Sequence, residues 1–119
     1  MADQSTSELS ILVLRLGLAG VFLIAGGAKL AGAKSLRDFF EGLGLPGAPM
    51  YAVGAAEVAG GVGLLWPPTA LWAAGGLSLL MLGAIGSQVR AGRSFIQTLP
   101  PVVVFAATSY LIFLIWSAD

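Results

Sequence analysis

Long apolar stretches separated by short polar segments dominate the chain. Four of these stretches, residues 11–31, 48–66, 69–89 and 100–116, contain very few charged side chains. A helix of about 20 mostly apolar residues is long enough to cross the hydrocarbon core of a bilayer. Four such stretches in 119 residues leave too little polar surface for a soluble domain. The pattern therefore predicts an all-α fold, a polytopic membrane four-helix bundle that forms a single transmembrane domain over residues 1–119.

The segment between the first two spans, residues 35–43, has a different pattern. Its apolar residues recur at the spacing of one helical face, and they are Leu36, Phe39, Phe40 and Leu43. Ser35 followed by Asp38 is typical of a capping box at a helix start. We expect a short helix that lies in the membrane interface, with Lys34 and Arg37 directed toward the lipid headgroups.

Two proline pairs mark the remaining connections. Pro67 and Pro68 make up the whole second connection, so the second and third spans should form a tight antiparallel hairpin. Pro100 and Pro101 should start the fourth span, because the N–H groups of the first helical turn have no intrahelical partner and proline is tolerated there.

Basic side chains gather in the first and third connections. Lys34 and Arg37 lie in the first, and Arg90 and Arg93 lie in the third, whereas the second connection carries no charge. By the positive-inside rule, both basic connections face the cytoplasm. The N- and C-termini are then non-cytoplasmic.

The composition excludes several classes of function. Hydrophobic residues make up 57% of the chain, charged residues make up 10%, and the formal net charge is zero. A protein that binds nucleic acid needs a basic surface, so nucleic acid is excluded as a partner. Without cysteine or histidine there is no thiol relay, no iron–sulfur ligation and no histidine-ligated metal. We identify no catalytic residue, no metal site and no covalent cofactor, and we expect that the chain does not catalyse a reaction alone.

Three ionisable residues fall within the predicted spans: Arg15 and Lys29 in the first span and Glu57 in the second. A carboxylate at mid-membrane is costly unless it is paired, hydrogen-bonded or protonated. An antiparallel hairpin places Glu57 between the two basic residues in depth. Arg15 is the expected partner, because a guanidinium binds a carboxylate in a bidentate manner, whereas Lys29 is expected to snorkel to the interface.

This intramembrane polar site has two interpretations. A buried ion pair can fix the register of two helices and have no further role. Alternatively, intramembrane ionisable residues mark binding sites and proton paths, and the site then binds a polar headgroup, a quinone carbonyl or a proton. A few uncharged polar side chains are expected to hydrogen-bond between helices, and these are Ser78, Ser87, Gln88, Gln97, Thr108, Ser109 and Tyr110.

Four sequence segments resemble the DoxX/DoxD family of small membrane proteins. They are residues 15–22, Ala25-Gly26-x-x-Lys29, Leu43-Gly44-Leu45-Pro46 and Glu57-x-x-Gly60-Gly61, and they occur in the order typical of that family. The resemblance covers residues 15–86. It implies a four-helix membrane protein, and it places Arg15, Lys29 and Glu57 within the family pattern without a known catalytic role.

The resemblance also suggests a functional context. One branch of the family contributes to thiosulfate:quinone oxidoreductases, and another is linked to membrane oxidoreductase complexes in redox-stress responses. Related four-helix thiol oxidoreductases use paired cysteines, which this chain lacks. The resemblance therefore suggests a small subunit of a redox assembly in a prokaryotic cytoplasmic membrane. Such a subunit would contact lipids and other membrane subunits and help to form a quinone site.

Two alternatives remain open. In the first, the chain is a purely structural accessory subunit of a larger respiratory or photosynthetic complex, and lipid fills its clefts. In the second, it is a small transporter or lipid-handling protein. If loss of the chain lowers the stability of the complex and leaves the turnover per complex unaltered, the first alternative is favoured. Substrate-dependent flux in vesicles would mark the second.

Overall fold

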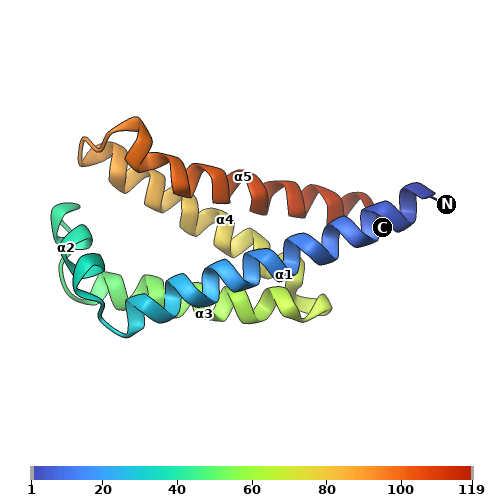
Figure 1. Cartoon of the computed structure of the whole chain (residues 1–119), viewed down its shortest axis with the longest axis horizontal. Coiled ribbons are helices and arrows are strands. Elements are labelled where there is room, and N and C mark those ends of the chain that lie inside the picture. The colour runs from blue at the N-terminus through green and yellow to red at the C-terminus, as the bar shows by residue number, and fades with distance from the viewer. Residues whose placement is uncertain (1, 119) are drawn as a thin grey trace.

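A computed structural model describes residues 2–118, which form five α-helices joined by short turns (Figure 1). The helices are α1 (Ala2–Leu30), α2 (Lys34–Gly42), α3 (Ala48–Leu65), α4 (Pro67–Arg90) and α5 (Phe95–Ala118). No strand occurs among the described residues. Four of the helices are long and apolar enough to cross a membrane, namely α3, α4 and the segments Glu8–Leu30 and Phe95–Ser117 of α1 and α5. The predicted all-helical membrane fold is confirmed.

The long helices pack as two antiparallel pairs, α1 with α3 and α4 with α5. The two pairs are in contact toward the end where the α3–α4 turn lies, and they diverge toward the opposite end, where α2 lies between them (Figure 1). A buried apolar core joins the pairs, and it includes Leu18, Phe22, Leu64, Ala74, Leu77, Met81 and Leu111. The bundle is therefore closely packed over one part of its length and open near α2.

Small residues determine how closely α1 and α3 approach. A Cβ atom on Gly26 would lie 2.6 Å from the carbonyl oxygen of Gly54, and a Cβ atom on Gly54 would lie 2.8 Å from Cβ of Lys29. Backbone atoms cannot move aside at such distances, so only glycine permits this contact. Small residues at membrane helix interfaces allow backbones to approach in this way. The glycine contact sets the register of the two helices, with Gly26 beside Glu57.

The short helix between the first two spans is present as α2, and its apolar face packs against the protein. Its location in a membrane interface stays a prediction. Phe40 and Leu43 are buried, while Lys34, Arg37 and Glu41 are exposed. The capping prediction was wrong. The helix begins at Lys34, its N-cap residue is Ala33, and no side chain caps it. Ser35 therefore lies two residues after the N-cap position, inside the helix, and cannot act as the cap.

The prediction for the start of the fourth span was also wrong, because α5 begins at Phe95 and its prolines lie inside the helix. Ser94 and Gln97 form a capping box: the N–H of Gln97 donates to Oγ of Ser94 at 3.2 Å, and the N–H of Ser94 donates to Oε1 of Gln97 at 3.0 Å. This Ser-x-x-Gln signal was present in the sequence and starts the helix before Pro100. The first part of α5 is angled to the rest (Figure 1), as expected where proline removes helical hydrogen bonds.

The connection between α3 and α4 is shorter than predicted. Pro67 and Pro68 occupy the first turn of α4, and Trp66 alone separates the two helices. The prolines have no N–H groups to donate to the last carbonyls of α3. The Thr69 side chain donates to carbonyl oxygens of this turn instead. Oγ1 of Thr69 donates to the carbonyl oxygen of Gly63 at 2.8 Å and to that of Trp66 at 3.1 Å.

Candidate ligand-binding cavity

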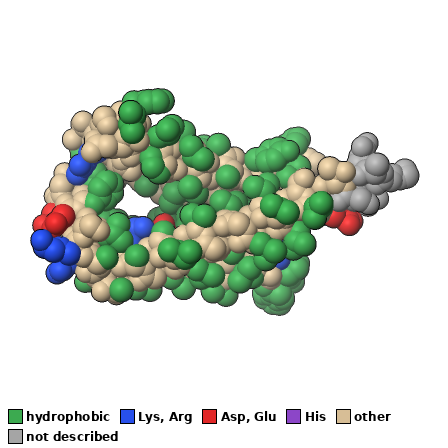
Figure 2. All heavy atoms as spheres, in the orientation of Figure 1, with side chains coloured by type: hydrophobic (Ala, Val, Ile, Leu, Met, Phe, Trp, Pro, Cys, Tyr) green, Lys and Arg blue, Asp and Glu red, His purple; other side chains and the backbone are tan. Residues whose placement is uncertain are grey.

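A cavity of about 530 Å³ occupies the space between the two diverging helix pairs. Figure 2 shows it as an opening in the face of the molecule, with blue and red side chains at its edge. All five helices contribute to its lining, which is mostly apolar. Phe22 and Met81 belong both to the core and to the cavity lining, so they separate the packed part of the bundle from the open part. The volume is within the usual range for pockets that bind small molecules.

An ion pair between α1 and α3 borders the cavity. Nζ of Lys29 lies 2.8 Å from Oε1 of Glu57, and the two side chains are 14% and 5% exposed. Both residues line the cavity. The Lys29 ammonium is thus the charge partner of the buried Glu57 carboxylate. The pair is neutral overall.

The expected partner of Glu57 was Arg15, and the structure shows that this expectation was wrong. The glycine contact places Glu57 level with Gly26, which is three residues from Lys29 and eleven from Arg15. Eleven helical residues span about 16 Å, which is too far for a direct contact. Lys29 therefore does not snorkel to the interface, because helical side chains point toward the N-terminus of their own helix. In antiparallel helices, this tilt brings Lys29 and Glu57 together.

Arg15 lies away from the cavity, at the end of α3. Its Nε donates to the carbonyl oxygen of Leu64 at 2.7 Å, and its Nη2 donates to that of Leu65 at 2.9 Å. The last four carbonyls of a helix have no intrahelical donor, and they carry the negative end of the helix dipole. Arg15 thus caps α3 where the following prolines cannot. Of the three predicted site residues, the structure brings together Lys29 and Glu57 and places Arg15 elsewhere.

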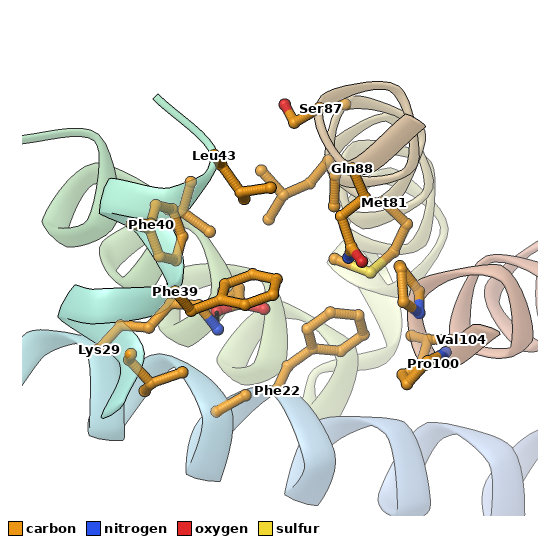
Figure 3. A pocket seen from close by; sticks show the side chains of 18 of the residues that line it. Phe22, Lys29, Phe39, Phe40, Leu43, Met81, Ser87, Gln88, Pro100 and Val104 are labelled. Carbon is orange, nitrogen blue, oxygen red and sulfur yellow. Dashed lines mark ion pairs between the residues drawn. The ribbon is translucent and has the colours of Figure 1, made fainter. Parts of the chain in front are cut away.

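A further buried polar side chain faces the cavity from the other helix pair. Gln88 on α4 is 5% exposed, and its Oε1 has no hydrogen-bond partner among the described residues. In Figure 3 the Gln88 amide and the Lys29 ammonium extend into the cavity from different helices, with the ring of Phe22 nearby. The sequence marked Gln88 only as an interhelical hydrogen-bond residue. Gln88 lies across the cavity from α1 because the α1–α3 and α4–α5 pairs diverge at this end. No local sequence signal reveals that divergence.

Of the uncharged polar side chains expected to hydrogen-bond between helices, Ser78 and Thr108 do so, between α4 and α5, whereas Gln97 bonds to Ser94 within one turn. Oγ of Ser78 donates to Oγ1 of Thr108 at 2.8 Å, and Thr108 in turn donates to the carbonyl oxygen of Phe105 at 3.0 Å. Both hydroxyl groups are satisfied within the protein. The Ser78–Thr108 hydrogen bond therefore joins α4 and α5.

Helix α2 covers the open end of the cavity. Phe39 and Phe40 of α2, together with Leu43 directly after it, line the cavity (Figure 3). Arg93 in the α4–α5 turn holds α2 from the opposite side: its guanidinium carbon lies 5.2 Å from the centre of the Phe39 ring, and its Nη2 donates to the Phe39 carbonyl oxygen at 3.5 Å. A cation–π contact of this kind contributes about 0.5–1 kcal/mol at an exposed site. Arg93 therefore links the short helix to the α4–α5 pair.

Comparison with known proteins identifies the family. The model of the DoxX-like family matches residues 13–111, and the chain belongs to this family of membrane proteins. The match includes Arg15, Lys29, Glu57 and Gln88, so all the polar residues discussed above lie within the family region. No curated protein and no solved structure matches the chain.

Proposed function

We propose that this protein is a small membrane subunit of a redox assembly and that its cavity binds a quinone. The observation that carries the proposal is the position of Lys29, Glu57 and Gln88, which are polar groups buried beside an apolar cavity within the spanning helices. Ionisable residues in such positions are expensive and mark functional sites by default. A merely structural ion pair does not require a cavity next to it.

The chemistry of a quinone matches the surfaces of the cavity. A quinone joins a flat ring with two polar oxygens to an apolar tail. The ring of Phe39, which is only partly buried, offers an apolar face on which such a ring can stack. The ammonium of Lys29 and the amide of Gln88 supply polar contacts, and the remaining lining accommodates the tail.

The cavity also connects with the outer surface of the helices. Val21 on α1 and Leu79 on α4 both line the cavity and are 48% and 70% exposed. In a membrane these apolar residues contact lipid tails. A lipid-soluble ligand therefore reaches the cavity sideways from the bilayer, and its tail remains between the helices.

The chain itself offers little to exchange electrons with a quinone. It has no cysteine and no histidine, so a partner subunit supplies the electrons in this proposal. The basic residues Lys34, Arg37, Arg90 and Arg93 flank α2 and the α4–α5 turn. The positive-inside rule places that end at the cytoplasmic face of a prokaryotic inner membrane, with both termini on the other side.

The test begins with purification from native membranes in mild detergent. Co-purified proteins are identified by mass spectrometry, and lipids are extracted and analysed for quinone. We expect redox subunits and quinone in stoichiometric amounts. Glu57→Gln should then lower quinone-dependent turnover of the intact assembly, whereas Glu41→Gln, the same change on the exposed face of α2, should leave turnover unchanged.

Two outcomes would contradict the proposal. Unchanged turnover of an intact Glu57→Gln assembly would remove the quinone site from this cavity. A complex that contains lipid instead of quinone at this chain, and that loses stability but not turnover when the chain is deleted, would favour the structural alternative.

A further inference from the structure

The cavity reaches the outer surface of the bundle between α3 and α4, where the two helix pairs diverge. Val53 on α3 and Leu79 and Gly83 on α4 line the cavity there, and we call this the α3–α4 opening. Leu79 is 70% exposed, and Gly83 is exposed as well. Leu79 lies near the middle of α4, so in a membrane the opening faces the hydrocarbon tails of the lipids.

Gly83 has no packing role within this chain. A Cβ atom on Gly83 would meet nothing within 4 Å, whereas a Cβ atom on Gly60 of α3 would collide with the side chain of Leu77 on α4. The backbone of Gly83 is helical and its φ is not positive, so the backbone does not require glycine either. Gly83 is the one glycine among the cavity-lining residues that the structure describes. The lack of a side chain at this position therefore keeps the α3–α4 opening clear.

The ion pair of the cavity lies directly inside this opening. Glu57 follows Val53 by one helical turn on α3, and both residues line the cavity. The Lys29 ammonium, paired with Glu57, extends into the same space (Figure 3). A ligand whose polar ring contacts Lys29 therefore has an apolar path to the bilayer, past Val53 and Gly83.

The face of the molecule shown in Figure 2 carries another opening, between α1 and α5. Val21, Ala25 and Val104 line the cavity on that side, and each of them has a side chain. No position there is left clear in the way that Gly83 leaves the α3–α4 opening clear. The α3–α4 opening is therefore the better path for an apolar chain.

We propose that the tail of the bound quinone leaves the cavity through the α3–α4 opening, and that Gly83 determines whether a tailed ligand fits; this inference rests on the proposed function. The ring lies inside, against Lys29 and Phe39, and the tail passes over Gly83 into the lipid. Gly83 is thus a specificity-determining residue for the tail and makes no contact with the ring. The ligand class that fits is a quinone with a long apolar chain.

The test compares a decyl-substituted benzoquinone with the same benzoquinone that carries a methyl group in place of the decyl chain. The full chain is placed in nanodiscs of phosphatidylethanolamine and phosphatidylglycerol, and binding is measured by calorimetry with empty nanodiscs as the baseline. Because an added side chain overfills the path of the tail, Gly83→Leu should weaken binding of the decyl compound at least about tenfold. Binding of the methyl compound should change less than about twofold.

Two further variants sharpen the comparison. Gly83→Ala adds a smaller group and should give an intermediate loss for the decyl compound. Gly76→Leu is the matched control, because Gly76 is exposed on the same face of α4, nothing lies within 4 Å of its added Cβ, and it does not line the cavity. It should leave the binding of both compounds unchanged.

The possible results separate this inference from the proposed function. If neither compound binds the unmodified protein, both are overturned. If both compounds bind and Gly83→Leu weakens them equally or not at all, the tail does not pass Gly83, and the proposed quinone site stands. A selective loss in Ala25→Leu instead would place the tail in the opening between α1 and α5. An equal loss in Gly76→Leu would assign the effect to packing of α4 against another helix.

Discussion

Lys29 and Glu57 approach each other because each side chain points toward the N-terminus of its own helix, and the two helices are antiparallel. The Nζ–Oε1 distance is 2.8 Å. Glu57 lies level with Gly26, and Cβ of Lys29 lies beside Gly54, so the two residues start about one helical turn apart. The helical tilt of their side chains closes that gap. The ion pair is thus a consequence of the helix register, which the glycine contact sets.

Removal of Lys29 alone should destabilise the protein more than removal of both charges. Lys29→Met leaves the Glu57 carboxylate buried without its partner, and a change of this kind costs about 3 kcal/mol or more. Replacement of both residues by methionine should restore much of the lost stability, because no buried charge remains. Chemical unfolding in detergent measures the difference, and Lys34→Met on the exposed face of α2 serves as the control. A double variant no more stable than Lys29→Met would contradict this account.

The contact between Gly26 and Gly54 should be intolerant of a methyl group. Gly26→Ala places Cβ 2.6 Å from a backbone oxygen of α3, so the helices must separate, at a cost of about 2 kcal/mol. Gly27→Ala is the matched control, since nothing lies within 4 Å of its added Cβ. The free energy of unfolding measures both effects. Equal stability of the two variants would show that α1 and α3 do not pack through Gly26.

The sequence revealed the fold more fully than the site. Span length and hydropathy are local properties, so four spanning helices and the apolar face of α2 were predictable. Helix register is not local, because the long connection between α1 and α3 permits several alignments. For this reason, Arg15 rather than Lys29 was expected to pair with Glu57. The position of Gln88 depends on how the two helix pairs diverge, and this is a property of the whole bundle.

Arg15 should stabilise the end of α3 without affecting the cavity. Arg15→Met removes two hydrogen bonds from a charged donor to the carbonyl oxygens of Leu64 and Leu65. We expect a loss of about 2 kcal/mol in the free energy of unfolding. Amide hydrogen exchange should increase in the last turn of α3, while the affinity for a quinone probe should stay the same, because Arg15 does not line the cavity. A large loss of affinity in a folded variant would contradict the assignment of Arg15 to helix capping.

Arg93 should keep α2 closed over the cavity. Its guanidinium contacts both the ring and the carbonyl oxygen of Phe39, from a turn that is distant in the sequence. Arg93→Gln removes the cation–π contact, so opening of α2 should become about two- to fivefold more frequent, as a loss of about 0.5–1 kcal/mol implies. Faster amide exchange confined to residues 34–43, together with faster release of a bound quinone probe, measures this change. Arg90→Gln provides an exposed control. Unaltered exchange in α2 would mean that its apolar face alone holds the helix in place.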